Sequence, residues 1–130
     1  MANERDREFW FALDKHIAAA ELEKKLRASE CYVLVADGVP AGILRYNLFW
    51  DNTPFMNMLY LLEENRGKGM GRRLVEFWEE QMKLQSYTYV MTSTSSDEYA
   101  QHFYHRLGYS TIGGFMFMEE PYEIMLSKKI

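Results

Sequence analysis

The segment that most constrains the fold runs from Phe55 to Gln85, where a strand pattern passes through a glycine-rich turn into a helix pattern. Residues 55–62 are apolar and aromatic, as expected of a strand. Beyond the turn, apolar side chains recur on one face of a helix from Gly71 to about Gln85. These side chains are Leu74, Val75, Trp78 and Met82. A strand that continues directly into a helix predicts a crossover connection within an α/β sheet.

Hairpin patterns precede this segment, and alternating strands and helices follow it. The first thirty residues are predicted to be helical with a break near His16 to Ala20, and their apolar positions are Phe9, Trp10, Leu13, Ile17, Ala20, Leu22 and Leu26. The other predicted elements are strands 31–36, 41–50 and 55–62, a helix 71–85, a strand 87–91, a helix from 97, and strands 109–118 and 122–126. The order α-α-β-β-β-α-β-α-β-β predicts a mixed α/β sheet in a single domain, residues 1–130.

Turn and cap residues mark several boundaries. Turns are predicted at residues 37–40 and 51–54. The polar run Ser95 to Asp97 is predicted to cap the last helix, and Gly108 is predicted to follow its final turn. Ala100, Phe103 and Leu107 of that helix are expected to face the core.

The composition narrows the class of partner and the compartment. Lys and Arg total 15 against 19 Asp and Glu, for a net charge of −4, which argues against a nucleic-acid partner. The N-terminus has no apolar leader segment and no stretch approaches about 18 apolar residues, so we expect a cytoplasmic protein without a membrane segment. The single cysteine, Cys31, lies in an apolar run and is predicted to be a buried structural thiol. No metal site is expected.

The turn before the long helix, Arg66 to Arg73, contains four basic residues, three glycines and no acid. Glycines at alternate positions allow positive φ angles and let backbone N–H groups approach a ligand closely. The helix adds the positive end of its dipole, and Arg66, Lys68 and Arg72 add charge at the rim. This combination predicts a binding site for a pyrophosphate or a similar anion.

Other glycine-rich loops fit the sequence poorly. A Walker A loop requires Gly-Lys followed by Ser or Thr, which is absent, and a dinucleotide-binding fingerprint would place its third glycine later than Gly71. A kinase-type glycine loop leads into a strand rather than a helix. A helix N-terminus that is glycine-rich and basic for structural reasons alone stays open as the alternative.

Two stretches resemble the GNAT superfamily of acyl-CoA N-acyltransferases. Arg66-Gly67-Lys68-Gly69-Met70-Gly71 resembles its Arg/Gln-x-x-Gly-x-Gly/Ala motif. Asp97 to Tyr109 resembles its Asn-x-x-Ala-x-x-Phe-Tyr-x-x-x-Gly-Phe segment. The order of the elements fits as well, so the resemblance covers essentially the whole chain. It implies a three-layer fold whose central, mostly antiparallel sheet is splayed at an acyl-CoA cleft.

The resemblance also implies an activity and site residues. The activity would be transfer of an acetyl group from acetyl-CoA to a primary amine of a small molecule or peptide. Tyr104 would protonate the departing CoA thiolate, and a backbone N–H near Leu61 would stabilise the oxyanion. The implied residues around the co-substrate are Tyr60, Leu61, Leu62, Arg66, Gly67, Lys68, Gly69, Met70, Gly71, Arg72, Asp97 and Tyr104.

The sequence departs from the superfamily pattern in several places. Asp97 stands where Asn is common, and Tyr109 replaces a Phe. The chain starts almost at the first helix, with no segment that matches the superfamily's first strand; a sheet that is one strand short and a chain start that is trimmed or divergent both stay open. The strand 55–62 carries no acid that could act as general base. His16, His102 and a water reached through Asp51 are the alternatives, and an amine that arrives neutral needs no base.

Polar and aromatic residues around the second turn form a further cluster. Amides, an acid and aromatic rings suit an acceptor pocket for a cationic, polar amine. Turn chemistry with aromatic packing explains the same residues equally well. The predicted acceptor-binding residues are Asn47, Trp50, Asp51, Asn52 and Phe55.

The strand 112–118, with Gly113-Gly114 inside it, could carry a bulge or a homodimer contact.

Three functions compete for this sequence. The first is an N-acetyltransferase. The second is a CoA-binding regulatory or interaction domain without turnover, which the missing base favours. The third is a purely structural module.

Overall fold

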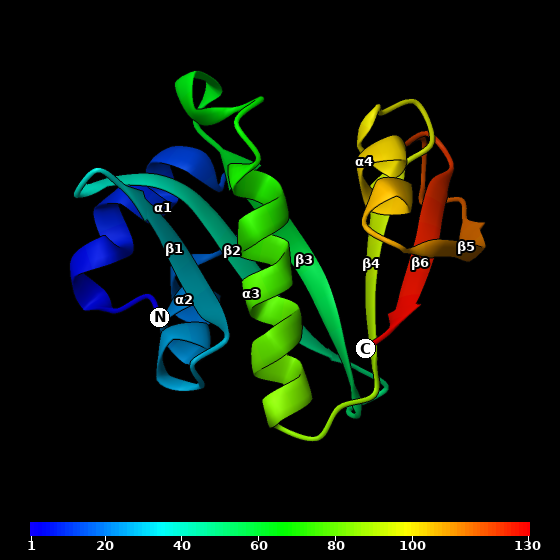
Figure 1. Cartoon of the computed structure of the whole chain (residues 1–130), viewed down its shortest axis with the longest axis horizontal. Coiled ribbons are helices and arrows are strands. Elements are labelled where there is room, and N and C mark those ends of the chain that lie inside the picture. Colours follow the sequence, from blue (N-terminus) through cyan, green and yellow to red (C-terminus); the bar gives the residue numbers. More distant parts are fainter. The chain divides into compact units, whose positions relative to one another are not determined.

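The computed structural model describes residues 1–130, and its elements follow the predicted order (Figure 1). The first half contains η1 (Glu4–Asp6), α1 (Arg7–Leu13), α2 (Ala19–Arg27), β1 (Cys31–Ala36), β2 (Val39–Phe49), β3 (Thr53–Leu61) and η2 (Glu63–Asn65). The second half contains α3 (Met70–Leu84), β4 (Tyr89–Ser95), α4 (Ala100–Arg106), β5 (Ser110–Phe115) and β6 (Glu123–Lys129). The predicted break in the N-terminal helical region is confirmed at residues 14–18.

The six strands form one mixed sheet in the order β1-β2-β3-β4-β6-β5. β1 pairs with β2 antiparallel, and β6 pairs antiparallel with both β4 and β5. β3 and β4 are parallel, with Phe55 opposite Met91 and Met56 opposite Thr92. This parallel pair is the one that α3 connects, which confirms the crossover expected from the strand–turn–helix segment.

The chain forms two compact units, and each is described by itself below. Unit 1 contains residues 1–47 and 57–76, and unit 2 contains residues 48–56 and 77–130. The single domain expected from the sequence stays a prediction. No helix is long and apolar enough to cross a membrane.

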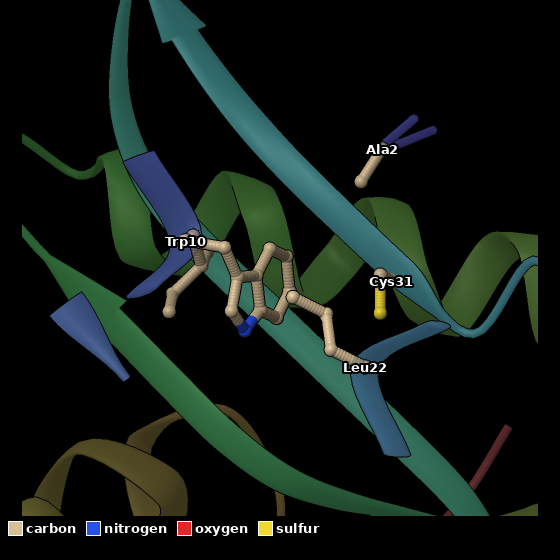
Figure 2. Close-up of a cluster of buried hydrophobic side chains, with 5 residues drawn as sticks. Ala2, Trp10, Leu22 and Cys31 are labelled. Atoms are coloured by element: carbon tan, nitrogen blue, oxygen red, sulfur yellow. The ribbon is translucent and has the colours of Figure 1, made fainter. Parts of the chain in front are cut away.

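In unit 1, α1 and α2 pack on the first strands through a buried cluster. Its fully or almost fully buried members are Ala2, Trp10, Leu22, Cys31 and Ile43. Leu22 points toward the indole ring of Trp10, and the Cys31 thiol lies in the same cluster (Figure 2). The prediction of a buried structural thiol is confirmed, whereas Ala20 is exposed and does not join the apolar face. No strand precedes α1; instead the N–H of Ala2 donates to the carbonyl of Cys31 over 3.0 Å.

In unit 2, the buried side chains include residues of β3, α3, β4, α4 and β6. Residues Trp78 and Met82 of α3, Val90 of β4 and Leu126 of β6 have no exposed surface. The apolar face predicted for α3 is thereby confirmed. α4 lies next to β4 (Figure 1).

The two ends of α4 compare differently with the sequence. Its C-terminal end is confirmed: Gly108 has φ +97°, the N–H of Gly108 donates to His105, and that of Tyr109 donates to Tyr104. This is the Schellman pattern that a glycine permits. The predicted N-terminal cap, Ser95 to Asp97, is wrong, because the N-cap residue is Tyr99, which makes no side-chain cap bond. β4 extends to Ser95, whose hydroxyl donates to Asp97 instead.

Candidate functional site

The glycine-rich turn of unit 1 has the geometry of an anion site. Gly67 and Gly69 have φ +75° and +79°, and no atom lies within 4 Å of the position that a Cβ would take on either residue. α3 begins at Met70, and the first bond of helical type is from the N–H of Arg73 to the carbonyl of Gly69, at 3.1 Å. In general, the N–H groups in the first turn of an α-helix are left available by the helix itself. An anion at this helix end would meet these N–H groups and the positive end of the dipole.

Basic side chains surround this turn, and two of them already have partners. The guanidinium of Arg66 lies 5.0 Å from the centre of the Tyr60 ring, and its Nε donates to the carbonyl of Leu61 over 3.0 Å. Arg72 donates to Glu76 over 3.1 Å, between two half-exposed side chains. Such exposed contacts are weak and can be exchanged for a ligand anion. Lys68 is exposed at the same turn.

The strand end before the turn is less open than expected. The N–H of Leu62 donates to the carbonyl of Ala41 over 2.8 Å, and the carbonyl of Leu61 accepts the bond from Arg66. Tyr60 is exposed and carries the Arg66 contact. Of the groups predicted to lie around the co-substrate, the Leu62 N–H and the Leu61 carbonyl are therefore engaged within unit 1.

Tyr104, in unit 2, is the buried aromatic residue of α4. It is 7% exposed, whereas Phe103, which the sequence placed on the core face, is half-buried. Its hydroxyl is hydrogen-bonded to Thr92 of β4, and Thr92 Oγ1 donates to the carbonyl of Met56 over 3.0 Å. Burial, with a smaller contribution from Glu98, raises the pKa of Tyr104 to about 12.

A buried polar network, formed by Glu79, Tyr109 and Lys128, lies next to Tyr104. The Tyr109 hydroxyl donates to Glu79 Oε2 and Lys128 Nζ donates to Glu79 Oε1, both over 2.8 Å. The Tyr109 ring stands edge-on to that of Tyr104, with centroids 5.7 Å apart, and the Tyr109 N–H donates to the Tyr104 carbonyl over 3.0 Å. Burial and the neighbouring Glu79 carboxylate raise the pKa of Tyr109 well above its usual range. The network therefore fixes the turn that holds Tyr104.

A second buried network, in unit 1, fixes the α1–α2 connection. Asp14 Oδ2 accepts bonds from Arg45 Nε at 2.7 Å and Trp10 Nε1 at 3.1 Å, and Asp14 Oδ1 accepts from the backbone N–H of His16. Burial alone would raise the pKa of Asp14, but the bonds from Arg45 and from the His16 N–H outweigh it and lower that pKa. The His16 side chain is exposed. His16, the candidate base, is thus held through its backbone.

The predicted acceptor residues divide between the units. In unit 1, Asn47 is exposed and accepts a bond from the Asn57 amide over 2.8 Å. In unit 2, Trp50 and Asp51 form the tip of the β2–β3 hairpin with φ +54° and +61°, and Trp50 is exposed. The Phe49 ring stacks on Phe55 and touches Trp50, and Asn52 accepts a bond from Thr53. Asp97 is exposed and accepts the bond from Ser95.

Three residues of interest escaped the sequence analysis: Thr92, Glu79 and Arg45. Glu79 follows Val75 by four residues, on the apolar face of α3, and an acid at such a position signals a buried partner. Thr92 and Arg45 carry no comparable signal, because their partners come from distant parts of the chain.

Comparison with known proteins identifies the family. The chain belongs to the acetyltransferase (GNAT) family, whose model matches residues 2–109. Membership makes acetyl transfer the general activity that this fold serves. No match was found among curated proteins.

Solved structures agree with this fold. Ard1 from Thermoplasma volcanium has a TM-score of 0.85 at 14% identity, over 97% of this chain and 92% of that one. A Bacillus subtilis acetyltransferase in complex with CoA has a TM-score of 0.79 at 16% identity, over 100% of this chain and 94% of that one. A chain of the NatC complex bound to Gag peptide and CoA has a TM-score of 0.77 at 14% identity, over 99% of this chain and 92% of that one. At these identities the likeness is one of fold.

Proposed function

We propose that the chain is an acetyl-CoA-dependent N-acetyltransferase whose acceptor is a primary amine of a small molecule or peptide. Family membership supports acetyl transfer. Two structures of similar fold were solved with CoA, and one of these is bound to a peptide. The observation that carries the proposal is the turn of unit 1, where two glycines of positive φ lead into α3 among exposed basic side chains.

The turn would hold the CoA pyrophosphate. Its open space at Gly67 and Gly69 lets phosphate oxygens approach the backbone, and the N–H groups at the start of α3 supply donors. Arg66, Lys68 and Arg72 would add charge, with the first and last giving up their present partners. An anion with two phosphates suits a site that offers both backbone donors and several cations.

Acetyl transfer has simple proton requirements. The amine nitrogen attacks the thioester carbon, the C–S bond breaks, the thiolate takes up one proton and the amine nitrogen loses one. We assign the proton donor to Tyr104. β3 carries no acid that could remove the amine proton. Either His16 acts as the base, or the amine arrives neutral and needs none.

The binding step is tested by calorimetry with acetyl-CoA on a matched pair of variants. Gly69→Ala and Gly38→Ala both place a side chain at φ +79° with no atom within 4 Å, so both introduce the same backbone strain. We expect only Gly69→Ala to weaken acetyl-CoA binding, about 10-fold or more. Equal loss in Gly38→Ala, or none in Gly69→Ala, would count against the turn as the CoA site.

The transfer step is tested by thiol release from acetyl-CoA with a panel of small-molecule and peptide amines. Tyr104→Phe keeps the ring and removes the proton donor, so kcat is expected to fall about 100-fold with little change in acetyl-CoA affinity. An unchanged kcat would remove Tyr104 from the chemistry. His16→Asn, on an exposed side chain, tests the base in the same assay.

A second candidate function is a CoA-binding regulatory or interaction domain with weak catalysis. Two observations favour it. The hydroxyl of Tyr104 is directed at Thr92, with a pKa of about 12, and β3 offers no general base. Binding of acetyl-CoA without transfer to any amine of the panel would support this alternative over the enzyme.

A further inference from the structure

Strand β5 and the segment that follows it form an exposed apolar surface in unit 2. We call it the β5 patch and define it by the side chains of Ile112, Phe115, Met116, Phe117, Met118 and Tyr122. Their exposed fractions range from 42% to 82%. Every residue from Ser110 to Tyr122 is exposed, so that neither face of β5 is covered. Isolated exposed apolar residues are ordinary, but a contiguous set of this kind marks an interaction site.

The backbone of β5 is also open on one side. β5 is the last strand of the sheet and pairs with β6 alone, beside which it lies in Figure 1. Proteins normally protect such an edge with charged residues, proline or a β-bulge. The nine residues from Ser110 to Met118 contain no charged residue and no proline. The one irregularity is a register shift between Thr111 and Gly113, which leaves Ile112 unpaired with its side chain exposed.

We propose that the β5 patch is a self-association surface, on which a second copy of this chain pairs its own β5 antiparallel about a twofold axis. A twofold axis brings the same strand opposite itself, so the patch must be compatible with its own residues. An uncharged strand meets this condition, because no like charges come face to face. Gly113, with open space where a Cβ would lie, permits close approach of a second backbone.

The area of the patch fits this partner. If each of its six large side chains has a surface of about 200 Å², the exposed fractions leave about 700 Å² of apolar surface. Stable specific interfaces bury about 800 Å² on each partner. The patch therefore comes close to the size of a complete dimer interface, and the strand pairing would add backbone hydrogen bonds to it.

Sedimentation equilibrium over a concentration series tests the proposal. We expect the protein of residues 1–130 to form dimers, and Ile112→Lys and Phe117→Lys to raise the dimer dissociation constant at least 10-fold. Leu84→Lys is the matched control, because Leu84 is an apolar residue of unit 2 that is 70% exposed outside the patch. Circular dichroism confirms that each variant is folded, which is expected of exposed positions. The proposal is supported if the wild-type protein dimerises and, among the three variants, only Leu84→Lys keeps the wild-type dissociation constant.

Three results would overturn it. The first is a wild-type protein that stays monomeric throughout the series, which would leave the patch to a different partner. The second is a dimer that both patch variants leave intact. The third is hydrogen exchange of the β5 amides that does not slow as the dimer forms, because strand pairing must protect some of these amides.

Discussion

Replacing Tyr109 by Phe removes one hydroxyl group from the network of Glu79, Tyr109 and Lys128 and leaves the aromatic ring in place. The hydroxyl donates to a carboxylate over 2.8 Å, and both residues are buried, at 2% and 7% exposure. A hydrogen bond to a charged group contributes about 1.5–3 kcal/mol. Phe fills the same space, so no cavity adds to the loss. Glu79 keeps its bond to Lys128 in the variant, which places the expected cost near 2 kcal/mol.

Urea unfolding at neutral pH measures this cost. Tyr99→Phe is the matched control, because it deletes the same hydroxyl from a side chain that is 77% exposed, and it should stay within about 0.5 kcal/mol of wild type. Glu79→Gln completes a double-mutant cycle, for which we expect a coupling energy of about 1 kcal/mol or more with Tyr109→Phe. A loss below about 0.5 kcal/mol in Tyr109→Phe, or strictly additive effects, would refute the network as a source of stability.

Three further predictions concern buried ionisable groups. Asp14→Ala leaves Arg45 unpaired at 12% exposure and should cost about 3 kcal/mol in urea unfolding, whereas Glu21→Ala, which breaks the exposed pair with Lys24, should cost less than about 0.5 kcal/mol. Cys31 is buried, which raises its pKa to about 12, so a thiol reagent should label it only as fast as the protein unfolds; rapid labelling at neutral pH would contradict the structure. The pKa of Tyr104 rises from 10.0 to about 12 on folding, so its contribution is fully present below pH 10 and is lost as the pH rises to about 12. Stability should fall by up to about 3 kcal/mol over this range, and by less in Tyr104→Phe, as unfolding curves at each pH would show.

The order of the elements was predictable because local patterns determine it. The apolar spacing of α3 and the glycine after α4 each follow from one stretch of sequence, and both are confirmed. The prediction of where α4 starts was wrong because two local interactions compete there. Ser95 bonds to Asp97 rather than to a helix N–H, and β4 continues to Ser95, the first of the residues expected to form the cap.

Other features depend on residues far apart in the sequence and could not be predicted. Spacings of three and four place both Phe103 and Tyr104 near the inner face of a helix, but only the packing of α4 in the folded chain shows that Tyr104 is the buried one. An apolar strand pattern likewise does not reveal whether anything covers the strand. β5 contains no charged residue, yet both of its faces are exposed.

The division into two units gives the protein a pair of internal fluorophores. Trp10 in unit 1 and Trp78 in unit 2 are both fully buried, while Trp50 is exposed to water at the hairpin tip. With Trp50 replaced by Phe, variants that keep only one of the two buried indoles would each report the melting of one unit by a red shift of emission. Coincident transitions would mean that residues 1–130 unfold as one cooperative domain, and separated transitions that each unit melts by itself.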